Sequence, residues 1–112
     1  MATFTKVGFS GDTSGMGILV AAVATPGTTI HASTADTTFD EVWLYATNNH
    51  ISAVNLEIEF GQTSNIIKLS IPATSGLTIV IPGLCLGPSK TLAVFAGTTN
   101  VVSVFGYVNR IS

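Results

Sequence analysis

The chain has 112 residues, a length that fits one compact domain and leaves little room for a second. Only 9% of the residues are charged, 46% are hydrophobic, and the formal net charge is −2. This composition excludes a disordered chain, which would be richer in charge and poorer in β-branched residues. The basic residues are few and scattered, so we expect no nucleic-acid partner. They are Lys6, Lys68, Lys90 and Arg110.

The first 15 residues alternate like a strand over positions 2–9 and then become rich in Gly, Ser and Asp. Phe4 and Phe9 are five positions apart, so in a regular strand their side chains would point to opposite faces. Two structures fit this pattern. Residues 1–15 are either an N-terminal arm that contacts a neighbouring subunit or an edge strand of the domain formed by residues 16–112.

Residues 17–24 resemble the apolar core of a signal peptide. The segment before them is too long and too polar for the short basic leader that such a peptide needs. No apolar run approaches the roughly 20 residues of a transmembrane helix. We therefore expect a strand here, with no targeting signal and no membrane contact, in a protein made in a cytoplasm.

The rest of the chain is dominated by a period of two. Val42, Leu44 and Ala46 alternate with Trp43 and Tyr45, for example, as expected for a strand. Clusters of Gly, Pro, Asn and Ser, among them Pro82-Gly83, separate the runs and predict turns. The predicted strands are 3–9, 17–24, 28–32, 39–47, 51–60, 65–71, 77–81, 91–96 and 101–110. Eight or nine short strands without a helix predict a single all-β domain, a β-sandwich or barrel, with the jelly roll as one eight-stranded arrangement.

The sequence contains no pattern for a catalytic, cofactor-binding or metal site. His31 and His50 have the polar surroundings of exposed loops, and no spacing ties either to a nucleophile. Cys85 is the single cysteine and lies in an apolar stretch, so we expect a small buried side chain. Glu57 and Glu59 project in parallel from one strand face, which favours a solvated stripe over a glycosidase pair. We expect no enzyme activity, no metal and no cofactor.

The remaining acidic residues also match no site. Asp36, Asp40 and Glu41 do not have the spacing of an EF-hand calcium loop. We expect Asp40 and Glu41 to protect the start of a strand from pairing with the edge of another sheet.

Several predicted strands are apolar on both faces. Trp43 and Tyr45 share the face opposite Val42 and Leu44, whereas a monomeric sandwich should be polar on its outer side. Such a surplus, with so few charges, favours a subunit that is buried in a larger assembly. The interface candidates are Phe4, Phe9, Trp43, Tyr45, Val101, Phe105 and Tyr107.

Parts of the second half of the chain resemble small virion proteins of tailed bacteriophages. The resemblance lies in D-E-V-W-L-Y-A-T-N at 40–48, L-E-I-E-F-G at 56–61, I-P-G-L at 81–84 and G-Y-V-N-R-I at 106–111. It also includes V-F-A at 94–96 and N-V-V at 100–102, and it covers roughly residues 38–112. It implies a β-sandwich that decorates or cements a capsid, or one in the head–tail region. No functional residue is transferred, because none of the matched positions is catalytic.

Together these observations predict a non-enzymatic virion structural protein, foremost a capsid decoration or cement protein. It would act as a homo-oligomer, such as a trimer, on the major capsid protein or another virion protein. A tail, neck or fibre component is the alternative within the same class. A carbohydrate-binding module is the alternative from another class, with Trp43 and Tyr45 as stacking platforms for sugars.

Overall fold

The computed structural model describes residues 3–12 and 14–112, and this part of the chain contains strands and no helix. Consequently, no helix there is long and apolar enough to cross a membrane. The strands are β1 (Phe4–Gly8), β2 (Ile18–Leu19), β3 (Thr28–Ala32), β4 (Phe39–Asn48), β5 (Val54–Gly61), β6 (Ile66–Ile71), β7 (Thr78–Leu86), β8 (Thr91–Ala96) and β9 (Val102–Ile111). The predicted all-β class is confirmed.

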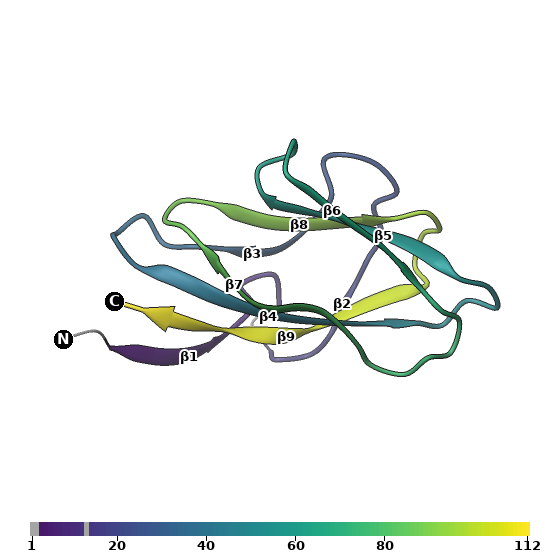
Figure 1. Cartoon of the computed structure of the whole chain (residues 1–112), viewed down its shortest axis with the longest axis horizontal. Helices are drawn as coiled ribbons and strands as arrows, with labels where there is room; N and C mark the ends of the chain where they lie inside the picture. The colour runs from purple at the N-terminus through teal and green to yellow at the C-terminus, as the bar shows by residue number, and fades with distance from the viewer. Residues whose placement is uncertain (1–2, 13) are drawn as a thin grey trace.

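The strands form two antiparallel sheets that pack face to face as a sandwich (Figure 1). The larger sheet has the order β1-β9-β4-β7, and the short β2 pairs with β9 beside this path. The smaller sheet has the order β3-β8-β5-β6. The two sheets thus have their edges at β1 and β7, and at β3 and β6.

The strand order is that of a jelly roll. With β2 set aside, the first strand pairs with the last, β1 with β9, and the next pairs are β3 with β8, β4 with β7 and β5 with β6. This is a long antiparallel ribbon folded over on itself, with successive strand pairs in alternate sheets. The strands predicted to form a sandwich or barrel therefore adopt the jelly roll, which the sequence analysis left as one of its alternatives.

Most predicted strand ends differ from the structure by one to three residues, and two predicted elements differ by more. The strand predicted at 17–24 is reduced to Ile18–Leu19, although Val20 still donates a backbone hydrogen bond to Val102. The turn predicted at Pro82 and Gly83 lies inside β7, where the pairing with β4 has two register shifts. Proline is tolerated there because β7 is an edge strand and bulges, so no interior ladder bond is lost.

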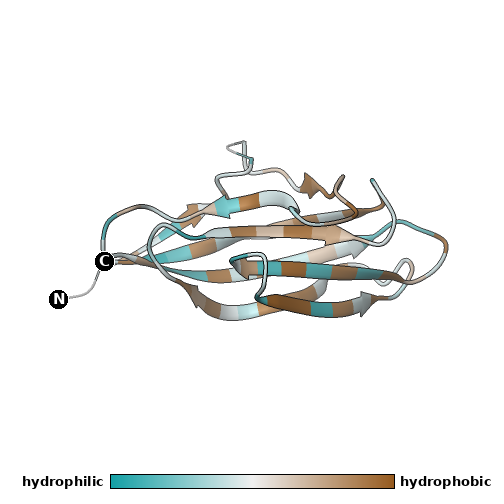
Figure 2. Cartoon of the chain, turned by 90° about the horizontal axis from the view of Figure 1, so that it is seen from above, coloured by the Kyte–Doolittle hydropathy of each residue, from teal (hydrophilic) through white to brown (hydrophobic). Residues whose placement is uncertain are grey.

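The core lies between the two sheets and consists of every second residue of the central strands. On β4 these residues are Val42, Leu44 and Ala46, all fully buried. Figure 2 shows the same alternation as brown and teal segments along the ribbons. The period of two in the sequence therefore reports which face of each strand points inward.

Candidate functional site

The outer face of the larger sheet brings together four aromatic side chains. The register of β4 with β9 places Trp43 opposite Tyr107 and Tyr45 opposite Phe105. The sequence indicated that Trp43 and Tyr45 share one strand face and, from their spacing of two, that Phe105 and Tyr107 share another. The structure brings all four onto one surface. We call these four residues the aromatic face.

Apolar residues of the neighbouring strands extend the aromatic face across the sheet. On β7, Pro82 lies opposite Trp43 and the exposed Ile79 lies opposite Tyr45. On the other side, the exposed Leu19 of β2 pairs with Ser103 of β9. The outer face thus carries an apolar stripe from one edge of the larger sheet to the other, which the composition of an isolated sandwich would not require.

Two glycines make room for these rings. A Cβ at Gly17 would lie 2.3 Å from Cε2 of Phe105, so the ring lies directly on the backbone there. A Cβ at Gly83 would lie 3.2 Å from Cζ2 of Trp43, and Gly83 also has a φ of +97° that other residues rarely adopt. The glycines therefore hold the two rings close to the sheet.

Three polar side chains beside the aromatic face interact with its rings or with one another; they are Glu41, Asn109 and Lys6. Glu41 accepts hydrogen bonds from Nε1 of Trp43 at 2.9 Å and from Nδ2 of Asn109 at 3.0 Å. These two bonds, that of Asn109 first, lower the pKa of Glu41 below its ordinary value. Lys6 places its Nζ 4.5 Å from the ring centre of Tyr107, in a cation–π contact. The face is therefore apolar in its middle and polar beside it.

The remaining interface candidates lie elsewhere. Phe4 is exposed on the edge strand β1. Phe9 is 6% exposed and belongs to the core, and Val101 is half-buried just before β9, packed against the core. The side chains of Phe9 and Val101 are thus already packed within their own domain.

A second candidate site is a buried polar cluster between the sheets, and it corrects two predictions. His31 is 1% exposed on β3, not in an exposed loop, and Asp40 is fully buried on the central strand β4, so it protects no edge. Nε2 of His31 lies 2.6 Å from Oδ2 of Asp40. Arg110 of β9 donates from Nε to Oδ1 at 2.9 Å and from Nη2 to Oδ2 at 3.0 Å. The cluster ties the smaller sheet to the larger one.

The hydrogen bonds determine the proton positions in the cluster. The backbone N–H of Ser10 donates to Nδ1 of His31 at 3.1 Å, so Nδ1 is unprotonated and Nε2 carries the proton that it donates to Asp40. Burial alone would raise the pKa of Asp40, but the hydrogen bonds from Arg110 and His31 outweigh it and hold the pKa below its ordinary value. Asp40 is therefore a paired carboxylate.

Ser10, His31 and Asp40 lie together without the geometry of a catalytic triad. Oγ of Ser10 accepts a hydrogen bond from the N–H of Ala32, and it is the backbone of Ser10 that contacts His31. A triad needs the hydroxyl itself bonded to the imidazole, so that the base can take its proton. The arrangement instead fastens the segment after β1 to β3.

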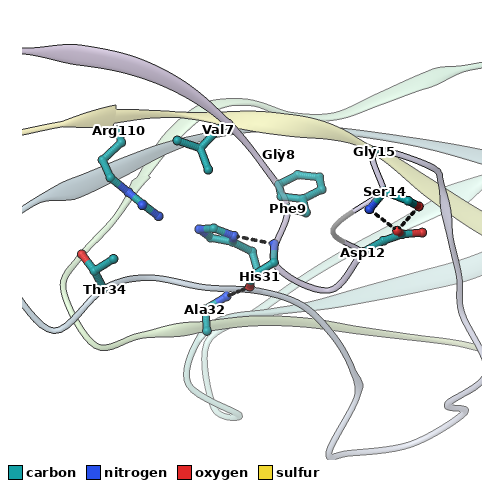
Figure 3. Close-up of a pocket in the computed structure, with 11 residues that line it drawn as sticks. Val7, Gly8, Phe9, Asp12, Ser14, Gly15, His31, Ala32, Thr34 and Arg110 are labelled. Carbon is teal, nitrogen blue, oxygen red and sulfur yellow. Dashed lines mark hydrogen bonds between the residues drawn. The ribbon is translucent and has the colours of Figure 1, made fainter.

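An open hollow of about 660 Å³ lies beside this cluster (Figure 3). Phe9, His31 and Arg110 line one part of it, and Asp12, which bonds Ser14, lies at the other end. Nε and Nη2 of Arg110 donate hydrogen bonds to Asp40, and both ring nitrogens of His31 are hydrogen-bonded, to Ser10 and to Asp40. Among residues 3–12 and 14–112, no group of three His, Cys, Asp or Glu side chains could hold a metal ion.

Two further predictions are corrected. Glu59 is buried, because it accepts bonds from the Thr25 hydroxyl and, at 2.8 Å, from the Gly27 N–H, so the 21–27 loop covers it. Its predicted partner Glu57 is half-buried and pairs with Lys68 at 3.1 Å. Cys85 is exposed, since it lies on the outer side of the edge strand β7 opposite Glu41.

The cluster was missed although the sequence carried a signal for it. Asp40 has the same parity as Val42 on its strand, and Arg110 has the same parity as Val108, so both charged residues fall on inward-facing positions. Buried charges are normally paired, so two of opposite sign at such positions predict an ion pair. The parity of His31 gave no such signal, because a bulge in β3 between Thr29 and His31 shifts the register.

Comparison of the chain with models of protein families, with curated proteins and with solved structures finds no match. The aromatic face and the buried cluster are therefore the observations from which a function can be proposed.

Proposed function

We propose that the chain is a non-enzymatic structural protein that packs against other protein subunits through its aromatic face. The observation that carries this proposal is the cross-strand register that places Trp43 opposite Tyr107 and Tyr45 opposite Phe105 on the uncovered side of the larger sheet. Aromatic side chains are enriched and charged ones depleted in the centres of protein interfaces. With 9% charged residues in the whole chain, the surface has the composition of a subunit that is partly covered in its assembly.

Within this class we propose a virion protein, foremost a capsid decoration or cement protein of a tailed bacteriophage. The resemblance of residues 38–112 supports this narrower proposal, and the jelly roll is a fold that viral capsid proteins use. Such a protein would act as a homo-oligomer, for instance a trimer, across the seams between major capsid protein subunits. Because it would bind only the assembled shell, it would stabilise that state by mass action. A tail, neck or fibre component would use the same face.

A carbohydrate-binding module is the second candidate, and one observation favours it. Trp43 and Tyr107 lie side by side on a sheet face, with Glu41 and Asn109 hydrogen-bonded beside them. Aromatic rings with polar groups next to them can stack on a sugar and bond its hydroxyls. Retention of the isolated chain on a glycan array, lost on Trp43→Ala, would support this candidate against the first.

The self-association part of the proposal is tested by light scattering coupled to size-exclusion chromatography at micromolar concentration. We expect a mass above the 11.6 kDa of one chain. Phe105→Asp should lower this mass, because the interface at the aromatic face would then bury an unpaired charge. Ile51→Asp is the matched control, since Ile51 is 94% exposed in the loop between β4 and β5. A wild-type monomer, or equal effects of both variants, would contradict packing through the aromatic face.

The virion part is tested on particles. Purified virions from the genome that encodes the chain should contain it in many copies, and Phe105→Asp should abolish its co-sedimentation with the shell. Absence of the chain from the particles would overturn the virion proposal and leave the self-association result standing.

A further inference from the structure

The smaller sheet ends in a strand whose outer backbone groups have no partner. On β5, Asn55 accepts a backbone bond from Gly97 beside β8, whereas Phe60 donates to Asn65 beside β6. In an antiparallel sheet these bonds alternate along the strand, so even-numbered residues of β5 bond to β6 and odd-numbered ones to β8. It follows that Ile66, Lys68 and Ser70 of β6 point their N–H and C=O groups away from the sheet. Within residues 3–12 and 14–112, no backbone hydrogen bond reaches these groups.

The other three edges are less open to a partner strand. The outer edge of β3 is already used, because Ile30 accepts a bond from Gly11 and Ala32 donates to Ser10. β7 is interrupted by Pro82 and by two register shifts. β1 is five residues long and leads directly to the buried Phe9. In contrast, β6 is six residues long, pairs with β5 without a register shift and contains no proline.

The same side of the sandwich carries exposed apolar side chains. β1 and β3 are joined at one side by the hydrogen bonds of residues 10 and 11, so β6 and β7 form the opposite side. Ile66 of β6, Ile79 and Leu84 of β7, and Leu77 in the connection between these strands are all exposed. Ile67 and Leu69 of β6 pack against the core but remain half-buried, because no strand lies beyond them.

We infer that a second copy of the chain pairs here, with β6 antiparallel to β6 of its partner across a two-fold axis. Rotation about an axis perpendicular to the smaller sheet keeps the inner faces of both copies on the same side, so it also brings β7 next to the partner's β7. One rotation thereby covers the unpaired backbone of β6 and the exposed side chains of β7, whereas a docked peptide strand would cover only the first. This inference deepens the proposed function, because it rests on the chain assembling with its own copies.

Charge selects the register of this pairing. Only Ile66, Lys68 and Ser70 offer outward bonds, so the two-fold axis must pass near residue 67, 68 or 69. An axis at Lys68 places that lysine directly opposite its copy, and like charges in opposed positions are destabilising. An axis at residue 67 removes this repulsion but places each Lys68 opposite the apolar Ile66 of the partner subunit. An axis at Leu69 places each Lys68 opposite the polar Ser70 of the partner subunit and Leu69 opposite itself, on the inner face. The continuous sheet would then be centred on Leu69.

Cross-linking tests this register directly. In a Cys85→Ser background, which removes the one native thiol, Leu69→Cys should form a disulfide-linked dimer under mild oxidation, because opposed residues of a non-hydrogen-bonded pair lie close together. Ile67→Cys is the matched control, since Ile67 lies on the same strand and face. We expect several times more dimer from Leu69→Cys than from Ile67→Cys. Equal, or no, cross-linking of both would overturn the inference.

A backbone variant tests the edge without a cysteine. The N–H of Ser70 points outward, so Ser70→Pro removes a donor to the partner and leaves the ladder to β5 intact. Because a dimer loses this bond twice, its dissociation constant in sedimentation should rise at least about tenfold. Ser70→Ala should leave it unchanged, and a thermal melt of both variants checks that they fold. An unchanged dissociation constant for folded Ser70→Pro would contradict the inference.

Combining variants separates this inference from the proposed function. If Leu69→Cys still cross-links in a Phe105→Asp background, the edge contact forms without the aromatic face, and the inference stands whatever the fate of that face. If Phe105→Asp lowers the mass while Leu69→Cys fails to cross-link, the aromatic face stands and the edge contact is wrong.

Discussion

His31 and Asp40 join the two sheets through a contact of 2.6 Å between Nε2 and Oδ2, and both side chains are buried. His31 comes from the edge strand of the smaller sheet and Asp40 from a central strand of the larger one. Ser10 bonds His31 from the segment after β1. This side of the sandwich is therefore closed by polar contacts, whereas β6 on the opposite side has outward-facing backbone groups. The aromatic face and the outer edge of β6 both lie outside these polar contacts.

Asp40→Asn should destabilise the domain strongly. The variant keeps the shape of the side chain but removes the charge that Arg110 and His31 face, and breaking a buried pair typically costs about 3 kcal/mol or more. Urea unfolding measures this loss. Glu57→Gln breaks the surface pair with Lys68 and serves as control, with an expected effect within about 1 kcal/mol. Equal effects would mean that the buried cluster does not stabilise the fold.

Stability should fall with acid in a way that depends on Asp40. Its pKa in the folded protein is lowered, so the unfolded chain takes up this proton at a higher pH than the folded one. The stabilisation that the Asp40 carboxylate contributes is complete above the ordinary carboxyl pKa. It is lost as the pH falls through the lower pKa that Asp40 has in the folded state. Urea unfolding midpoints of wild type and Asp40→Asn should therefore converge toward low pH. The pKa values of Asp12 and Asp36 are also lowered, but both residues are present in both proteins and cancel in the comparison.

Deletion of residues 2–12 decides between an arm and a strand at the N-terminus. The deletion removes β1, the core residue Phe9 and the contact of Ser10 with His31. We expect the melting temperature to fall by roughly 10 °C or more, because a buried aromatic side chain and an edge strand are lost. Phe4→Ala, which truncates an exposed ring, should melt like wild type. An unchanged melting temperature with loss of assembly would instead support the arm.

Gly106→Ala should be among the most damaging single changes in the larger sheet. Gly106 has a φ of +146°, and a Cβ there would lie 2.0 Å from the carbonyl oxygen of Trp43. Because the obstacle is backbone, the sheet itself must move, and we expect a loss of about 3 kcal/mol or more in urea unfolding. Gly97→Ala is the control, since a Cβ at Gly97 meets nothing within 4 Å. A small loss of unfolding free energy in Gly106→Ala would show that the backbone of β9 can shift at this point at little cost.

Much of the fold could be predicted because strand formation is read from local alternation. Val42, Leu44 and Ala46 point into the core as their period predicts. The strand predicted at 17–24 failed because its apolar residues do not alternate and only Ile18–Leu19 pair with β9. The turn predicted at Pro82 failed because the sequence does not reveal that its strand is an edge, where proline is tolerated.

The sequence by itself determined that the chain is all-β, which apolar residues of a regular strand such as β4 face inward, and that Trp43 and Tyr45 share an outer face. Only the tertiary structure decided which strands pair, and thus that these two residues lie opposite Tyr107 and Phe105. Strand pairing depends on packing summed over both sheets, and this sum is not encoded in any local stretch. The same reason hid the bond between Asp40 and Arg110, which are 70 positions apart and become neighbours only when β9 pairs with β4.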